Sequence, residues 1–360
     1  NVWRIVQLPE VESALVSIDS NDGAIRALVG GFDFYKNQFN HVTQAWRQPG
    51  SSFKPFIYSA ALEKGFTPAT IINDAPLSFS ATQTGGRLWE PKNFDGKFEG
   101  PIRMRTALTK SKNLASIRIL QAIGIRYAQD YITRFGFDAE RHPPYLPMAL
   151  GSGSVTPMQM AVGYAVFANG GFRVAPYFIK SIEDEKGNII EQFHPISVSS
   201  GAKRVIDPRN AFIMTSMMQD VINRGTATKA KQLGRSDLAG KTGTTSNFID
   251  AWFCGFQKDL VTIAWIGYDE PKSLGSNETG GRVALPLWMD YMDPVLKGIP
   301  IAGYPPPSGV KAAKINSATG LRDDYGDITE YFFNELLPPI IDNSIELAPK
   351  VTRDVKDQLF

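Results

Sequence analysis

Strand-like runs of apolar and β-branched residues occur near the start and again late in the chain, and helical spacing dominates between them. Residues 14–18 and 24–29 flank an Asp-Ser-Asn-Asp-Gly turn, which predicts a hairpin. Another hairpin is expected within 177–193, and further strands at 238–244, 251–256 and 260–266. Helices are expected from residue 53 onward and at 102–109, 113–123, 126–135, 157–168, 208–223 and 284–297. This order favours an α+β fold with an antiparallel sheet.

Composition excludes several classes of function. Of the 360 residues, 43% are hydrophobic and 21% are charged, as in globular domains. The net charge is only +2 and no dense basic run occurs, so electrostatic nucleic-acid binding is not expected. A single cysteine, Cys254, excludes an internal disulfide and a cysteine-based zinc site. Since the three histidines share no ligand spacing, we expect no metal site. We also expect no cofactor.

A proline-rich segment at 305–309 is the clearest break in composition. We therefore expect a main domain at 1–304, with 1–12 as a linker remnant, and a C-terminal extension at 305–360. No apolar run approaches the roughly 18 residues that cross a bilayer. The chain starts at Asn1 with a strand-like Val-Trp-Arg-Ile-Val, which indicates a fragment whose membrane anchor, if the natural protein has one, lies outside it.

The first motif with chemical potential is Ser51-Ser-Phe-Lys54, at the expected start of a helix. The spacing places the hydroxyl and the amine on one helix face, and a neutral amine can take the proton of a serine nucleophile. The alternative is a capping serine beside a solvated lysine. A second Ser-x-x-Lys, at 200–203, lies in a polar loop without helical periodicity.

The second motif is Ser111-Lys-Asn113, between two expected helices. A serine can relay a proton, and an asparagine can donate to and accept from a peptide-like substrate. Helix capping by Ser111 or Asn113 is the alternative.

The third motif, Lys241-Thr-Gly-Thr244, lies in an expected strand. Gly243 allows a ligand to approach the backbone, Lys241 supplies positive charge, and both threonines can bind a carboxylate. Gly-Lys-Thr also ends a nucleotide-binding P-loop. That motif requires glycine at position 235, which is arginine here, and a helix after the lysine, where we expect a strand.

The order of these motifs, separated by 60 and 130 residues, is similar to the signature of penicillin-binding proteins and the related β-lactamases. Over residues 8–300, and more loosely beyond, the chain resembles the transpeptidase domain of bifunctional (class A) penicillin-binding proteins, particularly the 1A type. Other segments that carry the resemblance are 23–31, 47–56, 89–94, 149–152, 167–171 and 250–253.

The resemblance implies a five-stranded antiparallel sheet flanked by helices, with the site between the sheet and the helical region. It implies a serine D,D-transpeptidase on the extracytoplasmic (periplasmic) face of the bacterial membrane. The partners would be peptidoglycan stem peptides, with a D-Ala-D-Ala donor and an amine acceptor, and β-lactams would acylate the same serine. Such proteins normally begin with a membrane helix and a glycosyltransferase domain, both of which we expect to be missing here.

The resemblance also assigns roles. Ser51 would be the nucleophile and Lys54 its base, pushed toward the neutral form by burial and by Lys241. Ser111 would pass the proton to the leaving amine, and Asn113 would hold the substrate amide. Thr242 and Thr244 would bind the terminal carboxylate, aided by Lys241, and Gly243 would let the substrate approach the backbone. The N–H groups of Ser51 and Thr244 would form an oxyanion hole. Trp89 and Asn93 are candidates for lining the groove, with a role in the folded scaffold as the alternative.

A class A β-lactamase adds a glutamate that activates water, yet no acidic residue occurs between Arg141 and Ser181, where it would be expected. We therefore expect an acyl-enzyme that is long-lived towards water. A D,D-carboxypeptidase differs only in passing the acyl group to water, so the motifs leave it open. A β-lactam-binding sensor without turnover also remains open.

Overall fold

The computed structural model describes residues 7–81 and 88–340 and is built around one five-stranded antiparallel sheet. Its strand order is β2-β1-β11-β10-β9, so strands from the two ends of the main domain lie side by side. These strands are β1 (Glu12–Asp19), β2 (Ile25–Val29), β9 (Ala239–Thr244), β10 (Ala251–Gln257) and β11 (Leu260–Gly267). The α+β prediction with an antiparallel sheet is confirmed.

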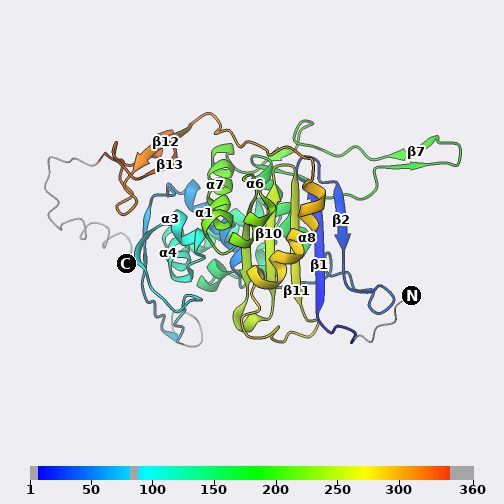
Figure 1. Cartoon of the computed structure of the whole chain (residues 1–360), viewed down its shortest axis with the longest axis horizontal. Coiled ribbons are helices and arrows are strands. Elements are labelled where there is room, and N and C mark those ends of the chain that lie inside the picture. Colours follow the sequence, from blue (N-terminus) through cyan, green and yellow to red (C-terminus); the bar gives the residue numbers. More distant parts are fainter. Residues whose placement is uncertain (1–6, 82–87, 341–360) are drawn as a thin grey trace.

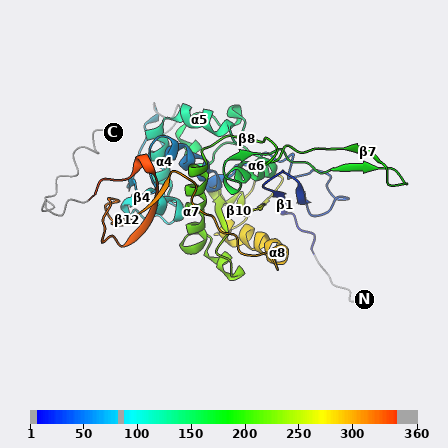
Figure 2. The same cartoon turned by 90° about the horizontal axis from the view of Figure 1, so that it is seen from above.

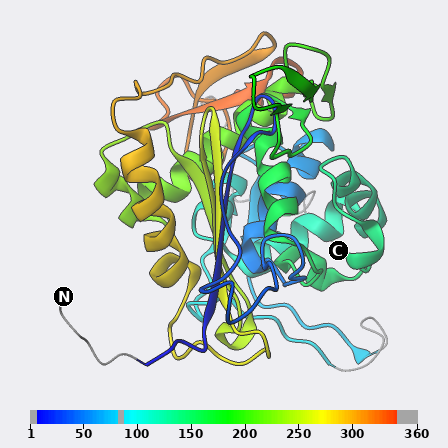
Figure 3. The same cartoon turned by 90° about the vertical axis from the view of Figure 1, so that its right-hand side faces the viewer.

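Both faces of the sheet are covered, so every residue of β10 is buried, and the strand is apolar up to its last residue, Gln257. Trp252 and Cys254 face the large core on one side, whereas Phe253 faces the smaller core beneath α8 (Leu285–Leu296). The alternation follows from the two-residue period of a strand. Figure 3 shows the sheet between α8 and the helical region.

The helical region contains most of the helices expected from periodicity (Figure 1). These are α1 (Lys54–Glu63), α3 (Met104–Thr109), α4 (Asn113–Ile123), α5 (Ile125–Thr133), α6 (Pro157–Ala168) and α7 (Pro208–Arg224). The expected helix at 102–109 starts later than predicted, because 100–103 form β4 (Gly100–Arg103), which pairs with β3 (Ile71–Asp74). The first helix is preceded by a 3-10 turn at Gly50–Phe53.

The hairpin expected within 177–193 is present as β6 (Ser181–Glu183) and β7 (Ile189–Gln192), which project away from the body (Figure 2). A smaller pair, β5 (Phe172–Arg173) and β8 (Lys203–Arg204), lies at its base. In the part of the chain that the structure describes, no helix is long and apolar enough to span a membrane.

Beyond the proline-rich segment, β12 (Val310–Ile315) and β13 (Ile328–Phe333) form a separate two-stranded sheet. Figure 1 shows it beside the helical region, where β13 contacts α7. The division near residue 304 stays a prediction. The hairpin was not predicted from the sequence.

Candidate active site

The nucleophile candidate lies where the helical region meets the edge strand β9. Ser51 is half-buried in the 3-10 turn, and Lys54 is the fully buried first residue of α1. Gly50 has a φ of 54°, and a Cβ at this position would lie 2.7 Å from the Thr244 carbonyl oxygen. Glycine therefore lets the backbone beside Ser51 pack directly against the end of β9.

Lys54 joins the first motif to the second. Its Nζ donates to the Ser111 carbonyl oxygen at 2.7 Å, to Ser111 Oγ at 3.3 Å and to Asn113 Oδ1 at 2.8 Å. Burial and, secondly, the charge of Lys241 hold the pKa of the Lys54 amine well below its usual value. A lowered pKa favours the neutral, proton-accepting amine, which is the form that general-base catalysis requires.

Ser111 is in the left-handed region, with a φ of 58°, between α3 and α4. Left-handed backbone is unfavourable for a non-glycine residue and persists only where its surroundings enforce it. Here it accompanies an arrangement in which Ser111 presents both its carbonyl and its hydroxyl to Lys54. Lys241 Nζ donates to the same hydroxyl at 2.8 Å, and burial lowers the pKa of its amine to about 7.

The third motif lies on β9 with its side chains divided between two faces. A Cβ on Gly243 would lie 2.4 Å from the Pro49 carbonyl oxygen, so glycine allows β9 to approach the Ser51 turn. Thr242 and Thr244 share one face because they are two residues apart. Thr242 Oγ1 lies 2.6 Å from Thr226 Oγ1, and Thr244 Oγ1 accepts from the Gly280 N–H at 3.1 Å.

The structure brings six of the predicted residues together through hydrogen bonds or adjoining backbone: Ser51, Lys54, Ser111, Asn113, Lys241 and Thr244. Thr242 and Gly243 connect Lys241 and Thr244 along β9. Two serine hydroxyls, two amines, an amide and the edge of a strand thus surround one region. Such a set can attack an acyl bond and hold a carboxylate.

Asn113 is the first residue of α4, and its amide bridges two segments. Its Oδ1 accepts from Lys54, and its Nδ2 donates to the Lys92 carbonyl oxygen at 2.8 Å. Since an amide nitrogen carries two hydrogens, Asn113 can also donate to a substrate.

Asn93 and Trp89 have packing roles in the structure. Asn93 is 4% exposed, and its Oδ1 accepts from the N–H groups of Asn113 and Leu114 at 2.8 and 3.3 Å, which caps α4. Its Nδ2 donates to Asp74 Oδ1 and to the Lys97 carbonyl oxygen. Trp89 stacks on the ring of Phe79 at 5.5 Å between centroids. This geometry supports the scaffold alternative for both residues.

Lys112, the middle residue of the second motif, was given no role from the sequence. Its side chain is 2% exposed and pairs with Asp95 at 2.8 Å, Glu99 at 3.1 Å and Asp74 at 3.7 Å. These ion pairs anchor the turn that carries Ser111 and Asn113 to the segment that contains Asn93.

Asp250 ties the nucleophile segment to the third motif. Its carboxylate accepts from Arg47 Nε at 2.7 Å, and its N–H donates to Thr245 Oγ1 at 2.8 Å. Arg47 precedes the Ser51 turn, and Thr245 follows Thr244. Arg47 and Asp250 both belong to segments that carry the family resemblance, but only the tertiary structure shows that they form an ion pair.

Neither the second Ser-x-x-Lys sequence, at 200–203, nor a P-loop at Gly-Lys-Thr fits the structure. Ser200 and Lys203 lie exposed outside the main sheet, and Ser200 bonds within its own turn. Lys241 lies within β9, and the next long element is β10, not a helix, so a P-loop is excluded. Within residues 7–81 and 88–340, no group of three or more histidine, cysteine or acidic side chains could hold a metal ion.

Comparison with known proteins identifies relatives of both sequence and fold. A family profile described as "Penicillin binding protein transpeptidase domain" matches residues 13–293. Penicillin-binding protein 1A of Neisseria lactamica is 49% identical over 358 residues, which is 99% of this chain and 43% of that protein. The chain thus spans less than half the length of this curated relative.

Solved structures agree with this relationship. Penicillin-binding protein 1A from Haemophilus influenzae has a TM-score of 0.90 and 37% identity, over 93% of this chain and 55% of that one. The PonA1 protein from Mycobacterium tuberculosis, solved in complex with penicillin V, has a TM-score of 0.71 and 27% identity, over 88% and 84% of the two chains. The family resemblance inferred from the three motifs is confirmed.

Proposed function

Since the chain belongs to the penicillin-binding protein transpeptidase family, we propose that it is a serine D,D-transpeptidase that cross-links peptidoglycan stem peptides. The observation that supports this most strongly is the Ser111 hydroxyl, which receives hydrogen bonds from both Lys54 and Lys241. This contact joins all three motifs around one potential substrate bond.

In the proposed acylation, Ser51 Oγ attacks the carbonyl carbon of the D-Ala-D-Ala bond while Lys54, in its neutral form, accepts the hydroxyl proton. The N–H groups of Ser51 and Thr244 stabilise the negative charge on the carbonyl oxygen. The carbon–nitrogen bond then breaks, and Ser111 delivers a proton to the departing D-Ala amine. Acylation thus forms one ester bond and breaks one amide bond.

Substrate binding is assigned to the side chains around this centre. Lys241, Thr242 and Thr244 hold the terminal carboxylate of the donor, and Asn113 bonds the donor amide. The amine of a neighbouring stem peptide then attacks the ester, which releases Ser51 and forms the cross-link.

A stable acyl-enzyme, rather than rapid hydrolysis of the kind that β-lactamases perform, is favoured by the segment that adjoins the nucleophile turn. Gly50 donates to the Gly151 carbonyl oxygen at 3.3 Å, so the segment around Gly151 borders the turn. The stretch between Arg141 and Ser181 contains no carboxylate that could activate water, which supports a long-lived acyl-enzyme.

We also propose that β-lactams acylate Ser51, as the penicillin V complex of the M. tuberculosis relative suggests. By analogy with its relatives, the domain would act on the extracytoplasmic face of the bacterial membrane.

Mass spectrometry of the intact protein after treatment with a fluorescent penicillin tests the assignment. We expect one adduct, mapped to the peptide that contains Ser51, and its loss in Ser51→Ala. The matched control is Ser200→Ala, in the second Ser-x-x-Lys sequence, which should keep the label. Labelling that survives in Ser51→Ala would refute the assignment.

Donor peptides that end in D-Ala-D-Ala distinguish the alternatives. A transpeptidase exchanges the terminal D-Ala for an added labelled amine, whereas a carboxypeptidase releases D-Ala without incorporating the amine. A sensor without turnover releases no D-Ala.

A further inference from the structure

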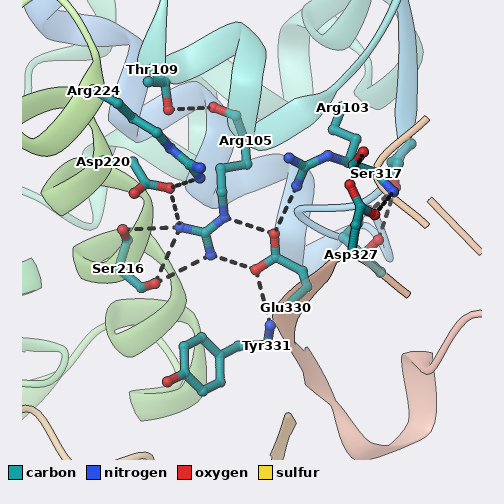
Figure 4. A network of polar contacts seen from close by, with 12 residues as sticks. Arg103, Arg105, Thr109, Ser216, Asp220, Arg224, Ser317, Asp327, Glu330 and Tyr331 are labelled. Atoms are coloured by element: carbon teal, nitrogen blue, oxygen red, sulfur yellow. Dashed lines mark hydrogen bonds and ion pairs between the residues drawn. The ribbon is translucent and has the colours of Figure 1, made fainter. Parts of the chain in front are cut away.

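A buried carboxylate joins the C-terminal hairpin to the helix that leads into the second motif. Glu330, on β13, is 1% exposed and lies outside residues 13–293, which the family profile matches. Its Oε2 accepts from Arg105 Nε at 2.7 Å and from Arg103 Nη1 at 3.3 Å. Its Oε1 accepts from Arg105 Nη2 and from the Tyr331 N–H. Figure 4 shows the carboxylate surrounded by these donors.

Arg105 extends this network to α7. Its Nη1 donates to Asp220 Oδ2 at 3.1 Å and to the Ser216 carbonyl oxygen at 3.0 Å, and Asp220 also pairs with Arg224 at 2.6 Å (Figure 4). Arg105 is 5% exposed, so its guanidinium depends on these partners for compensation of its charge. One arginine thus holds α3, α7 and β13 together.

Arg105 precedes Ser111 by only six residues in the sequence, so the network around Glu330 is connected to the second motif through α3. Arg105 lies in α3, and the last carbonyls of α3 accept from the turn that follows. The Ser111 N–H donates to the Leu108 carbonyl oxygen at 3.0 Å, and the Lys112 N–H donates to the Ala107 carbonyl oxygen at 2.9 Å. A displacement of α3 would therefore move Ser111.

The C-terminal end of α7 contacts both α3, which leads into the second motif, and β9, which carries the third. A Cβ on Gly225 would lie 2.3 Å from the Thr109 carbonyl oxygen, so α7 and α3 are in backbone contact there. The next residue, Thr226, places its hydroxyl 2.6 Å from that of Thr242. The spacing between α3 and α7 thus bears on the distance between the second and third motifs.

We propose that Glu330 is a positioning residue for acyl transfer: through Arg105 it fixes α3 against α7 and so sets the place of Ser111 between Lys54 and Lys241. The hairpin of β12 and β13 then contributes to the rate of acyl transfer through Glu330. This inference rests on the proposed function.

The test uses the full chain with Glu330→Gln, which keeps the shape of the side chain and removes its charge. Saturation kinetics with a chromogenic penicillin separate the acylation rate constant from the dissociation constant of the initial complex. Because Ser111 acts in proton transfer, we expect the acylation rate constant to fall at least about tenfold. The dissociation constant should stay within about twofold, at a temperature where circular dichroism shows the variant folded.

Glu335→Gln is the matched control, since Glu335 pairs with Arg209 of α7 at 2.8 Å but is 57% exposed. It should leave both constants unchanged. Glu330→Asp retains the charge on a shorter side chain and should recover part of the lost rate. If Glu330→Gln does not fold, Ser216→Ala makes the same test, because it removes contacts of Arg105 without leaving a buried charge unpaired.

A folded Glu330→Gln or Ser216→Ala protein with the wild-type acylation rate constant overturns the inference. The inference is also overturned if the loss of acylation rate in the variant is no larger than the fraction of that variant that is unfolded. If the wild-type protein is not acylated at Ser51, the proposed function itself fails, which is a distinguishable result.

Discussion

Lys54 and Lys241 donate to the same atom, the hydroxyl oxygen of Ser111, at 3.3 and 2.8 Å. Both lysines are fully buried, and two protonated amines this close repel each other in a medium of low polarity. One of the pair is therefore driven toward its neutral form. The structure points to Lys54, because the charge of Lys241 is among the causes that lower its pKa.

Replacing Lys54 by alanine should lower the rate of penicillin acylation at least about 10²-fold, the contribution expected of a general base. The measurement is the rate of adduct formation by mass spectrometry. Lys64→Ala, at the exposed end of the same helix, is the control and should react normally. A near-wild-type rate in Lys54→Ala would show that another group activates Ser51.

Acylation should decline as the pH rises through about 7. Burial lowers the pKa of Lys241 to about 7, so the positive charge that would bind the substrate carboxylate is lost above that pH. Arginine stays protonated at all accessible pH values. The decline should therefore move to higher pH in Lys241→Arg, whatever its absolute rate. A decline at the same pH in both proteins would assign it to another group.

The buried amine of Lys241 should also make stability depend on pH. Its pKa is about 7 in the folded protein and about 10.4 in a free lysine, so between these values the unfolded chain binds more protons. The free energy of unfolding should then rise with pH by up to about 1.4 kcal/mol per unit from this residue.

Urea denaturation of the wild type and of Lys241→Met between pH 7 and 9 tests this contribution together with the effect that the charge of Lys241 has on the pKa of Lys54. We expect the wild type to gain stability relative to the variant as the pH rises. Parallel pH profiles would contradict the prediction.

Gly243→Ala should separate β9 from the Ser51 turn. The added methyl would lie 2.4 Å from the Pro49 carbonyl oxygen and 2.9 Å from Ser52 Oγ, so the backbone must shift. We expect a loss of about 1–3 kcal/mol in stability, measured by denaturation, together with slower acylation. Gly303→Ala, where no atom lies within 4 Å of the added carbon, should change neither.

Asn93→Ala distinguishes a scaffold residue from a groove residue. Since Asn93 caps α4 and is hydrogen-bonded in a buried place, its loss should cost about 1–3 kcal/mol of stability. Asn37→Ala removes an amide whose hydrogen bond to Asp269 is exposed to solvent, and it should have little effect. If Asn93 instead lined the groove, its replacement would weaken the initial penicillin complex and leave the melting temperature unchanged.

The long elements were predictable because their signals are local. The 157–168 helix matches α6, and the 14–18 and 24–29 strands lie within or overlap β1 and β2. The β3 and β4 pair was missed because its strands are four residues each and their pattern is irregular. The hairpin of β12 and β13 was missed for a related reason: the charged Glu330 is buried, against the usual pattern, because two arginines from a distant segment compensate it.

By itself the sequence determined the chemical inventory and its order: a serine with a lysine one helical turn away, a Ser-x-Asn turn, and a Lys-Thr-Gly-Thr strand. It also determined that strands come from both ends of the domain. Only the tertiary structure decided which groups are hydrogen-bonded to one another. Lys241 donates to the Ser111 hydroxyl, the Asn113 N–H donates to Asn93, and Arg105 donates to Glu330. The physical reason is that pKa and hydrogen-bond partners depend on burial and on distances between segments far apart in the chain, which local patterns do not encode.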